Sequence, residues 1–426
     1  MKYSAIFFSL MFLCSLTATA RQPEKEELQF LIIEALSRNP EIAAEVSKMK
    51  MMDERIPQAG ALDDPQFTYK LMEFPGTRLG EAAYQNFELM QMIMFPTKLA
   101  TRKDIARVKA EHAHHEHLEK IIEIIAQLKK SYAMLWNART SLTITMENQR
   151  LLLQIISTAQ TLYAVGRASQ QDVLKSSIEL AKLQTQESSI RQEIIGAESM
   201  LRAILNRPQE AAFGSIELGE LVPVQHSLED ILQFAADNRP MIVHDSLSVR
   251  EGDLMVRMSR QEYFPDFKVS FERVTMPTMG VKTWTVMAGI TLPLSPWTFS
   301  KAFARVEEAQ ADRSMRASMY VATKNMVSAQ IREAYSRVKA SEVQVRSYEQ
   351  TILPQTSQSL QSLLAEYQTG KTSYLMLIDG FRMFQEMKMD AALARMKYEQ
   401  AIAGLERQAG VVNLIVIPIS PKENSK

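Results

Sequence analysis

The sequence has little cysteine, glycine or proline, and it has no net charge. Its 426 residues include one Cys, 14 Gly and 16 Pro, and 49 basic side chains balance 49 acidic ones. Without clustered excess Lys and Arg the chain lacks the surface on which phosphate affinity depends, which excludes a nucleic-acid partner. The scarcity of Gly and Pro, with no linker-like tract, favours one long and regular architecture over several small domains.

Motifs of catalysis are missing too. There is no Gly-x-Ser-x-Gly elbow, no phosphate-binding loop and no Cys/His metal quartet. The paired acids Asp63 and Asp64 lie at the entry of a predicted hairpin rather than in a pocket. We therefore expect neither an enzyme nor a bound cofactor.

The N-terminus has the features of a secretory signal peptide. Lys2 precedes an apolar run over residues 5–16, and the small residues at 18–20 match a signal-peptidase site. The run is short for a transmembrane helix, which takes roughly 20 apolar residues. We predict a signal peptide over residues 1–20, which removes Cys14. No later run is long enough either, so insertion into a membrane would have to use strands.

The sequence repeats itself at a shift of about 200 residues. Four motif pairs recur in the same order: Asn39-Pro40 with Arg239-Pro240, Pro65-Gln66-Phe67 with Pro265-Asp266-Phe267, Phe95-Pro96 with Leu292-Pro293, and the Tyr163/Gly166 pair with Tyr367/Gly370. Four ordered matches imply a duplicated unit. We predict a first repeat over residues 21–210, a second over 211–410, and a C-terminal segment and tail over 411–426.

Each repeat is predicted to contain one β-hairpin. Apolar and polar residues alternate along 267–271 and 284–292, which indicates a hairpin at about 266–293. The first repeat has its counterpart at about 66–95. The return strand of that hairpin has apolar residues on both faces, so its register stays open: Phe87 and Leu89 on one face, and Met90, Met92 and Met94 on the other.

Very long helices follow each hairpin. Residues 98–163 contain no Pro or Gly, and an unbroken helix of that length would extend about 100 Å at ~1.5 Å per residue. Ser169, with an acid three residues later, predicts a capping box at the start of the next helix. The second repeat has the same pattern over residues 300–410, interrupted at Pro354 and Gly370.

Four strands per chain are too few to close a barrel. A sheet in a membrane needs closed edges, because each unpaired backbone group in hydrocarbon costs several kcal/mol. If these strands are transmembrane, several chains must share one barrel: two chains would supply eight strands and three would supply twelve. We predict a mainly α protein with a transmembrane β-barrel shared between protomers, continuous with a tunnel of long helices.

The ordered motifs resemble the TolC family of outer-membrane efflux proteins over nearly the whole mature chain. The segments that carry the resemblance are Asn39-Pro40, 65–67, 91–99, Tyr163 with Gly166, 205–208, 238–240, 263–267 and Tyr367 with Gly370. The resemblance implies a homotrimer in outer-membrane lipid, with the long α-barrel in the periplasm. It also implies an equatorial collar built from 211–225 and 411–421, a periplasmic adaptor (membrane-fusion protein), and an inner-membrane pump of the resistance-nodulation-division type.

By the same resemblance, the two Gly-containing breaks are periplasmic tips that contact the adaptor. The tip residues are Val165, Gly166, Arg167, Ala168 and Ser169 in the first repeat, and Thr369, Gly370, Lys371, Thr372 and Ser373 in the second. Arg167 and Lys371 stand where the family often has an apolar or small residue. Capping of the adjoining helices is the alternative role for these residues.

The family closes its periplasmic aperture with the help of a tyrosine and two acids three residues apart. Tyr367 and Asp379 fall on matching positions, whereas Met376 replaces the other acid. Three copies of Asp379 would form one acidic ring, which favours cations.

Four of the six histidines lie close together, at His112, His114, His115 and His117. On a helix they form i,i+3 pairs that can bind a divalent ion, especially where three chains meet. A helical pair without a third ligand is a weak site, and acids are interspersed with these residues. We interpret the cluster as a solvated polar face and keep metal binding as the alternative.

Methionine is abundant, with 26 residues and clusters at Met49, Met51 and Met52 and at Met383, Met387 and Met389. Thioethers suit Cu(I), but Met more often fills gaps between helices. Residues 95–99 resemble the Phe-Pro-Gly-Lys-Leu run of heavy-metal efflux proteins, except that Thr97 replaces the glycine.

The sequence therefore predicts an outer-membrane channel subunit of a tripartite efflux system, passive in conduction and favouring cations over drugs as cargo. One alternative is a type I protein-secretion duct, because the cognate pump decides the cargo. The other is a periplasmic coiled-coil scaffold without a pore, which would leave the strands and the duplication without a role.

Overall fold

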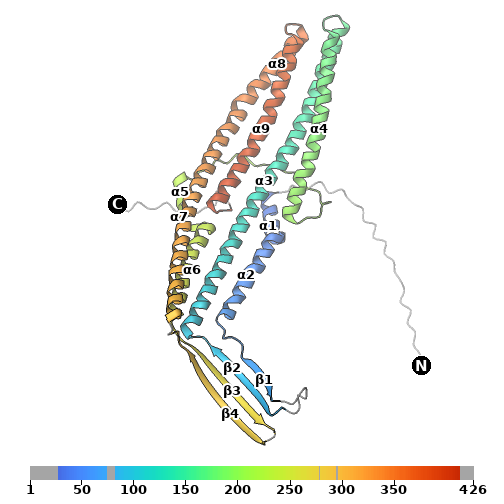
Figure 1. Ribbon diagram of the computed structural model, residues 1–426. Coiled ribbons are helices and arrows are strands. Elements are labelled where there is room, and N and C mark those ends of the chain that lie inside the picture. The colour runs from blue at the N-terminus through green and yellow to red at the C-terminus, as the bar shows by residue number, and fades with distance from the viewer. Residues whose placement is uncertain (1–26, 74–81, 278, 294–295, 413–426) are drawn as a thin grey trace, which may run out of the picture.

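The chain is elongated, with a β-sheet at one end and, at the other, the two turns that connect the long helices (Figure 1). The computed structural model describes residues 27–73, 82–277, 279–293 and 296–412. The predicted signal peptide, residues 1–20, lies outside this part of the chain, as does most of the predicted collar segment 411–421. Within the described residues, no helix carries an apolar stretch long enough to cross a lipid bilayer.

The elements follow the same order twice, which confirms the duplicated plan. The first half contains α1 (Leu28–Arg38), α2 (Pro40–Ala59), β1 (Gln66–Met72), β2 (Tyr84–Ile93), α3 (Pro96–Ala164) and α4 (Gln170–Leu205). The second half contains α5 (Leu228–Asn238), α6 (Pro240–Gln261), β3 (Asp266–Met276), β4 (Val281–Thr291), α7 (Pro296–Ser347), the π-helical turn η2 (Tyr348–Ile352), α8 (Leu353–Thr369) and α9 (Tyr374–Ala409).

The long helices form where they were predicted. Helix α3 runs for 69 residues without a break. In the second half the chain passes Pro354 without ending its helical path, because the π-helical turn η2 comes directly before it. Proline lacks an N–H and its ring crowds the preceding turn, so a local change of helical pitch accommodates it.

The four strands form one antiparallel sheet in the order β1-β2-β3-β4, and the β2–β3 pair joins the two halves. Directly paired residues of an antiparallel sheet share a face. One face is mainly apolar: Phe67, Tyr69, Leu71, Phe87, Leu89, Ile93, Phe267, Val269, Phe271, Trp284, Val286, Ala288 and Ile290. Its polar members are Gln85, Gln91, Arg273, Thr275 and Lys282. The pairing of Leu89 with Phe271 settles the open register of β2 and places Met90 and Met92 on the other face.

That other face of the sheet is mainly polar. It carries Thr68, Lys70, Asn86, Glu88, Lys268, Ser270, Glu272, Thr283 and Thr285. Lys70 Nζ lies 3.4 Å from Glu88 Oε2, and Asn86 donates a hydrogen bond to Glu272. A sheet with one apolar and one polar face separates a lipid-like from an aqueous environment.

Three hydrophobic cores lie along the helices. One packs α1, α3 and α4 of the first half, a second packs α5, α6, α7 and α9 of the second half, and a third joins α3, α4, α8 and α9 towards the tips. The third core draws on both halves, with Leu152 and Ile155 of α3 buried against Leu377 and Phe381 of α9. It therefore fixes the two tips relative to each other.

The repeated motif before α2 and α6 closes each half at its middle. Asn39 caps α2 through its side chain, which accepts hydrogen bonds from two backbone N–H groups, and its Nδ2 donates to Ile204 O at 2.8 Å. At the same place in the second half, the guanidinium of Arg239 donates to Gln408 O. Each motif thus ties the start of a short helix to the end of the last long helix of its own repeat.

Residues 211–225, the predicted first collar piece, adopt neither helix nor strand and cross the middle of the molecule. Tyr132 on α3 donates to Glu217 O at 3.0 Å, and Tyr398 on α9 donates to Val222 O at 2.7 Å. Arg395 on α9 adds a hydrogen bond to Gly219 O. This segment links α3 of the first half to α9 of the second.

Candidate functional site

The sheet and the helices meet at a buried ammonium group. Lys98, at the start of α3, donates to Phe264 O at 2.8 Å and to both carboxylate oxygens of Asp266 at 3.0 Å. Asp266 also accepts from the backbone N–H of Phe95. Because Lys98 belongs to the first half and Asp266 to the second, this cluster connects the two halves where the helices meet the sheet.

The two tips are built alike. Gly166 and Gly370 adopt positive φ values of 74° and 77°, which suit glycine because it has no Cβ. The next residue then donates back into the helix, Arg167 to Leu162 O at 2.8 Å and Lys371 to Glu366 O at 2.9 Å. The predicted capping role of these turns is therefore confirmed.

The helices that follow the tips begin at serine caps. Ser169 forms the predicted capping box with Asp172, and Ser373 accepts a hydrogen bond from the backbone N–H of Met376. Arg167 joins one tip to the other by donating to Thr369 O at 3.0 Å. Val165 is 64% exposed, which leaves an apolar side chain open to solvent at the end of the molecule.

Tyr367 does not lie on a free surface. It is buried in the third core beside Tyr374, with the two ring centroids 6.1 Å apart. Its hydroxyl has no hydrogen-bond partner among the described residues, and burial raises the pKa of Tyr367 to about 12. The hydroxyl of Tyr374, by contrast, shares a 2.6 Å hydrogen bond with Ser176 of α4.

Asp379 is exposed on α9, in a different environment from Tyr367. Its carboxylate lies 3.6 Å from Arg382, one turn further along the helix. Arg382 bonds Glu179 of α4 through two of its nitrogens, at 2.7 and 3.2 Å. The hydrogen bond from Arg382 holds the pKa of Glu179 below its usual range. Asp379 is thus anchored beside a cross-helix ion pair, while its carboxylate stays open to solvent.

The four clustered histidines divide into different environments. His114 is about half exposed and lies 3.6 Å from Asp53 of α2, in keeping with a solvated face. His112 is not solvated, because only 11% of its side chain is exposed. Burial and the nearby His244 lower the pKa of His115. Nδ1 of His117 is buried and has no hydrogen-bond partner among the described residues.

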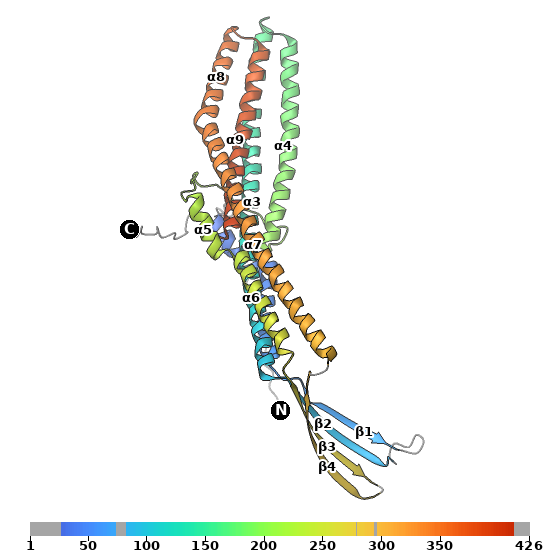
Figure 2. The same cartoon turned by 60° about the vertical axis from the view of Figure 1, so that its left-hand side comes forward.

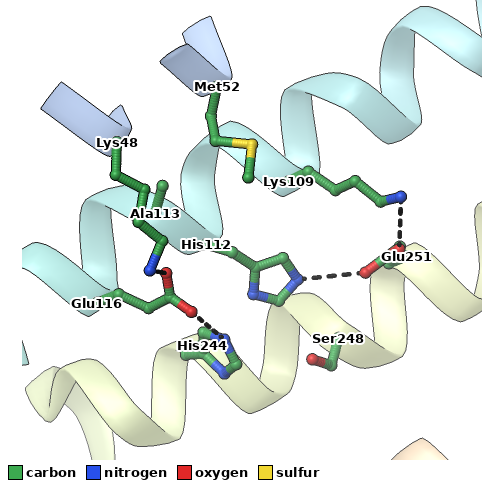
Figure 3. A pocket seen from close by; sticks show the side chains of 9 residues that line it. All are labelled: Lys48, Met52, Lys109, His112, Ala113, Glu116, His244, Ser248 and Glu251. Carbon is green, nitrogen blue, oxygen red and sulfur yellow. Dashed lines mark ion pairs between the residues drawn. The ribbon is translucent and has the colours of Figure 1, made fainter. Parts of the chain in front are cut away.

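His112 faces a pocket of about 300 Å³ between α2, α3 and α6 (Figure 3). Its ring meets that of His244 edge-on, with centroids 4.3 Å apart. Its Nε2 lies 3.5 Å from Glu251 Oε2, and His244 Nε2 lies 3.8 Å from Glu116 Oε1. Contact with His112, with Arg316 and Lys109 in addition, lowers the pKa of Glu251.

Sequence reasoning missed His244 and Glu251, which lie more than 120 residues from the cluster on α3. Their signal was weak, since each is a single polar residue on a helix with no local motif. The methionines also separate: Met52 lines the pocket, whereas Met51 and Met383 are exposed. No group of three His, Cys, Asp or Glu already arranged to hold a metal ion occurs in the described part of the chain.

The chain has a sheet with one mainly apolar face, joined through the Lys98–Asp266 ion pair (the junction clamp) to helices that end in two matched tips. This is the subunit architecture of an outer-membrane channel. The chain belongs to the outer membrane efflux protein family, whose model matches residues 31–207 and 231–411. The two matched ranges correspond to the two halves of the structure. The protein is accordingly an outer-membrane protein and not an enzyme.

A curated protein similar to this chain is the cobalt-zinc-cadmium resistance protein CzcC of Cupriavidus metallidurans, which is 20% identical over 263 residues. The aligned part spans 61% of this chain and 61% of that relative. Among solved structures, the outer-membrane channel OprN has a TM-score of 0.76 at 16% identity, with 90% of this chain and 89% of that chain covered. CusC has a TM-score of 0.76 at 15% identity, covering 96% and 98%. At such identities the structures establish the fold alone.

Proposed function

We propose that three copies of this chain share one barrel and form a single channel through the outer membrane. The observation that supports this is the open sheet: β1 and β4 each have one unpaired edge within the chain, while the sheet carries an apolar face suited to lipid. Open edges in hydrocarbon are too costly to persist. Pairing β4 of one chain with β1 of the next removes them, and three chains of four strands give twelve.

The mass of the protein extracted from outer membranes tests this assembly. Static light scattering, corrected for detergent, should give three times the mass of one mature chain. A monomer or dimer that still conducts ions in planar bilayers would overturn the shared barrel of three chains.

We further propose that the channel is the exit duct of a tripartite efflux system, with the tips as the adaptor contact. The two tips lie at the end of the molecule farthest from the sheet (Figure 2). They present exposed Val165, Arg167 and Lys371 on turns whose backbone is held by internal hydrogen bonds. A rigid turn with exposed side chains suits docking because little conformational entropy is lost.

If the tips contact the adaptor, a charged substitution at a tip should abolish efflux without affecting the channel itself. Val165→Asp should leave the trimer mass and the single-channel conductance unchanged, yet abolish the tolerance that the wild-type gene restores to a deletion strain. Leu153→Asp, at an exposed position of α3 well below the tip, is the matched control and should retain tolerance. Equal tolerance in both variants would argue against adaptor contact at this tip.

For the cargo we propose metal cations, moved by a resistance-nodulation-division pump. The support is the similarity to a protein named for cobalt, zinc and cadmium resistance, together with the Phe95–Leu99 run. A deletion strain should become sensitive to these three metals and keep its drug tolerance. Loss of a secreted protein, with unchanged metal tolerance, would instead favour the type I secretion duct. A scaffold without a pore finds no support, because it gives the sheet no role.

At the aperture, we propose that three copies of Asp379 form an acidic ring. Its exposed carboxylate supports this role, whereas buried Tyr367 would act by packing beneath the ring. Asp379→Asn should reduce the preference for cations over anions, measured from reversal potentials in a salt gradient. An unchanged reversal potential would remove Asp379 from the conduction path.

A further inference from the structure

The pocket between α2, α3 and α6 has more ionisable side chains than helix packing requires. Its lining includes two imidazoles and two carboxylates, from His112 and Glu116 on α3 and from His244 and Glu251 on α6, and the thioether of Met52 (Figure 3). The ammonium groups of Lys48 and Lys109 also line it. The backbones can approach here because Ala113 on α3 is small and almost fully buried. An apolar filling would pack the same space without the cost of desolvating these groups.

The nitrogens of His112 are the clearest sign of an unmet bonding capacity. Nδ1 has no hydrogen-bond partner among the described residues, and Nε2 has only the 3.5 Å contact with Glu251, although the side chain is nearly buried. A buried polar atom without a partner costs about 1–3 kcal/mol, so such atoms call for a specific explanation. A neutral imidazole nitrogen that is not hydrogen-bonded is the form in which histidine binds a metal.

We propose that this pocket binds a divalent transition-metal ion, of the Zn²⁺ or Co²⁺ class, through His112, His244, Glu251 and Glu116. Two nitrogen and two carboxylate donors match the preferences of these ions better than those of Mg²⁺ or Cu(I). This site would be separate from the conduction path and does not depend on which cargo the channel carries.

The spacing of the donors fits such an ion in part. In a tetrahedral site with bonds near 2.1 Å, neighbouring donor atoms lie roughly 3.4 Å apart. His112 Nε2 and Glu251 Oε2 are 3.5 Å apart, and His244 Nε2 and Glu116 Oε1 are 3.8 Å apart. The donors thus form two pairs, and three of them do not yet surround one point. Rotation of the two adjoining rings towards each other would bring the pairs together.

Two existing contacts bear on this rotation: the ion pair between Lys48 and Glu116 would open, and the 3.0 Å contact of His244 Nδ1 with Asp245 Oδ1 would shift with the ring. Lys48 Nζ lies 2.7 Å from Glu116 Oε2, and both side chains are more than one third exposed. Such a surface pair contributes only about 0–1 kcal/mol, so Lys48 can move into solvent at little cost. Lys109 and Arg316 contact Glu251 at 3.8 and 3.3 Å and would stay to balance the carboxylate charge.

Zinc binding to the purified full-length protein in detergent tests the site. After dialysis against a chelator, the wild type should bind one Zn²⁺ per chain in isothermal titration calorimetry. Co²⁺ should give the intense visible absorption of a tetrahedral site. The His112→Ala and His244→Ala variants should each bind about tenfold more weakly or lose binding altogether. His114→Ala is the matched control, because His114 lies two residues later, on the exposed side of α3, and it should bind as the wild type does.

Folding is checked separately, so that each outcome has one meaning. Circular dichroism and trimer mass should be unchanged in all three variants, and His244→Gln provides a second version that keeps a polar side chain of similar length. Wild-type binding that persists in the His112 and His244 variants, or that fails equally in His114→Ala, would overturn the proposal. So would the absence of stoichiometric binding in the wild type. Conductance and metal tolerance are not expected to decide the question, which keeps it distinct from the channel function.

Discussion

The clamp between sheet and helices can be tested by replacing Lys98 with methionine. The substitution keeps the length and apolar stem of the side chain but removes the ammonium group. It deletes three hydrogen bonds, one to Phe264 O at 2.8 Å and two to Asp266 at 3.0 Å. The backbone N–H of Phe95 still donates to Asp266, so the carboxylate keeps one partner.

The expected loss of unfolding free energy follows from the burial of the two side chains. Breaking a buried ion pair costs about 3–5 kcal/mol, because a charge is left without compensation. Here the Lys98 side chain is 9% exposed, but that of Asp266 is 34% exposed. Water can therefore solvate part of the remaining carboxylate, and we expect a loss of about 2–3 kcal/mol. For a chain of this size that corresponds to a fall of a few degrees in Tm.

A double-mutant cycle measures the pair directly. Thermal unfolding of the purified protein in detergent, followed by helical circular dichroism, should be compared for Lys98→Met, Asp266→Asn and the double variant. Lys182→Met is the control, since Lys182 forms a 3.4 Å pair with Glu179 and its side chain is 63% exposed. We expect less than about 1 kcal/mol there. If Lys98→Met unfolded at the wild-type temperature, or if the two clamp substitutions were simply additive, the clamp would not stabilise the junction.

Three further effects are expected in the same unfolding assay. Phe381→Ala, in the core beneath the tips, should cost about 3–5 kcal/mol, and a loss under 1 kcal/mol would contradict tight packing there. Gly370→Ala should cost about 1–2 kcal/mol, since φ is 77° and the new Cβ would meet Arg167 Nη2 at 2.8 Å. The hydrogen bond from Arg207 lowers the pKa of Glu34. The stability that this ion pair contributes is therefore present above the usual pKa of 4.5 and is lost as the pH falls through the lower folded value. Glu34→Gln should flatten that part of a Tm–pH profile, and an unchanged profile would exclude this pair as its cause.

Local rules predicted most of the elements. The stretch without Pro or Gly gave α3, and the serine with an acid three residues later gave the capping box at Ser169. The alternation of apolar and polar residues predicted both hairpins. The register of β2 could not be predicted in this way, because residues such as Phe87 and Met90 make both faces apolar. The pairing of Leu89 with Phe271 of β3, 182 residues later along the chain, decides which face of β2 joins the other aromatic residues.

The site shows a different limit of sequence reasoning. A helical pattern gives the spacing of His112 to His117 but not what approaches them from other helices. His244 and Glu251 meet His112 only because α6 packs along α3. Neither residue has a local motif that marks it. A tertiary contact of this kind becomes visible in sequence only through repeats or alignments, and the duplication offers no histidine counterpart to guide it.

The interpretation of the histidine cluster as one solvated face fails for a physical reason that applies to the whole of α3. A helix of 69 residues packs against α2 and α6 near the sheet and against α4 and α9 towards the tips. Its buried side therefore changes with its neighbours, and no single stripe of the sequence marks it. His112 faces α6 while His114, two residues later, faces solvent. Along such a helix, exposure must be judged turn by turn, and polar residues that fall on a contact with a third helix are the ones to examine for binding.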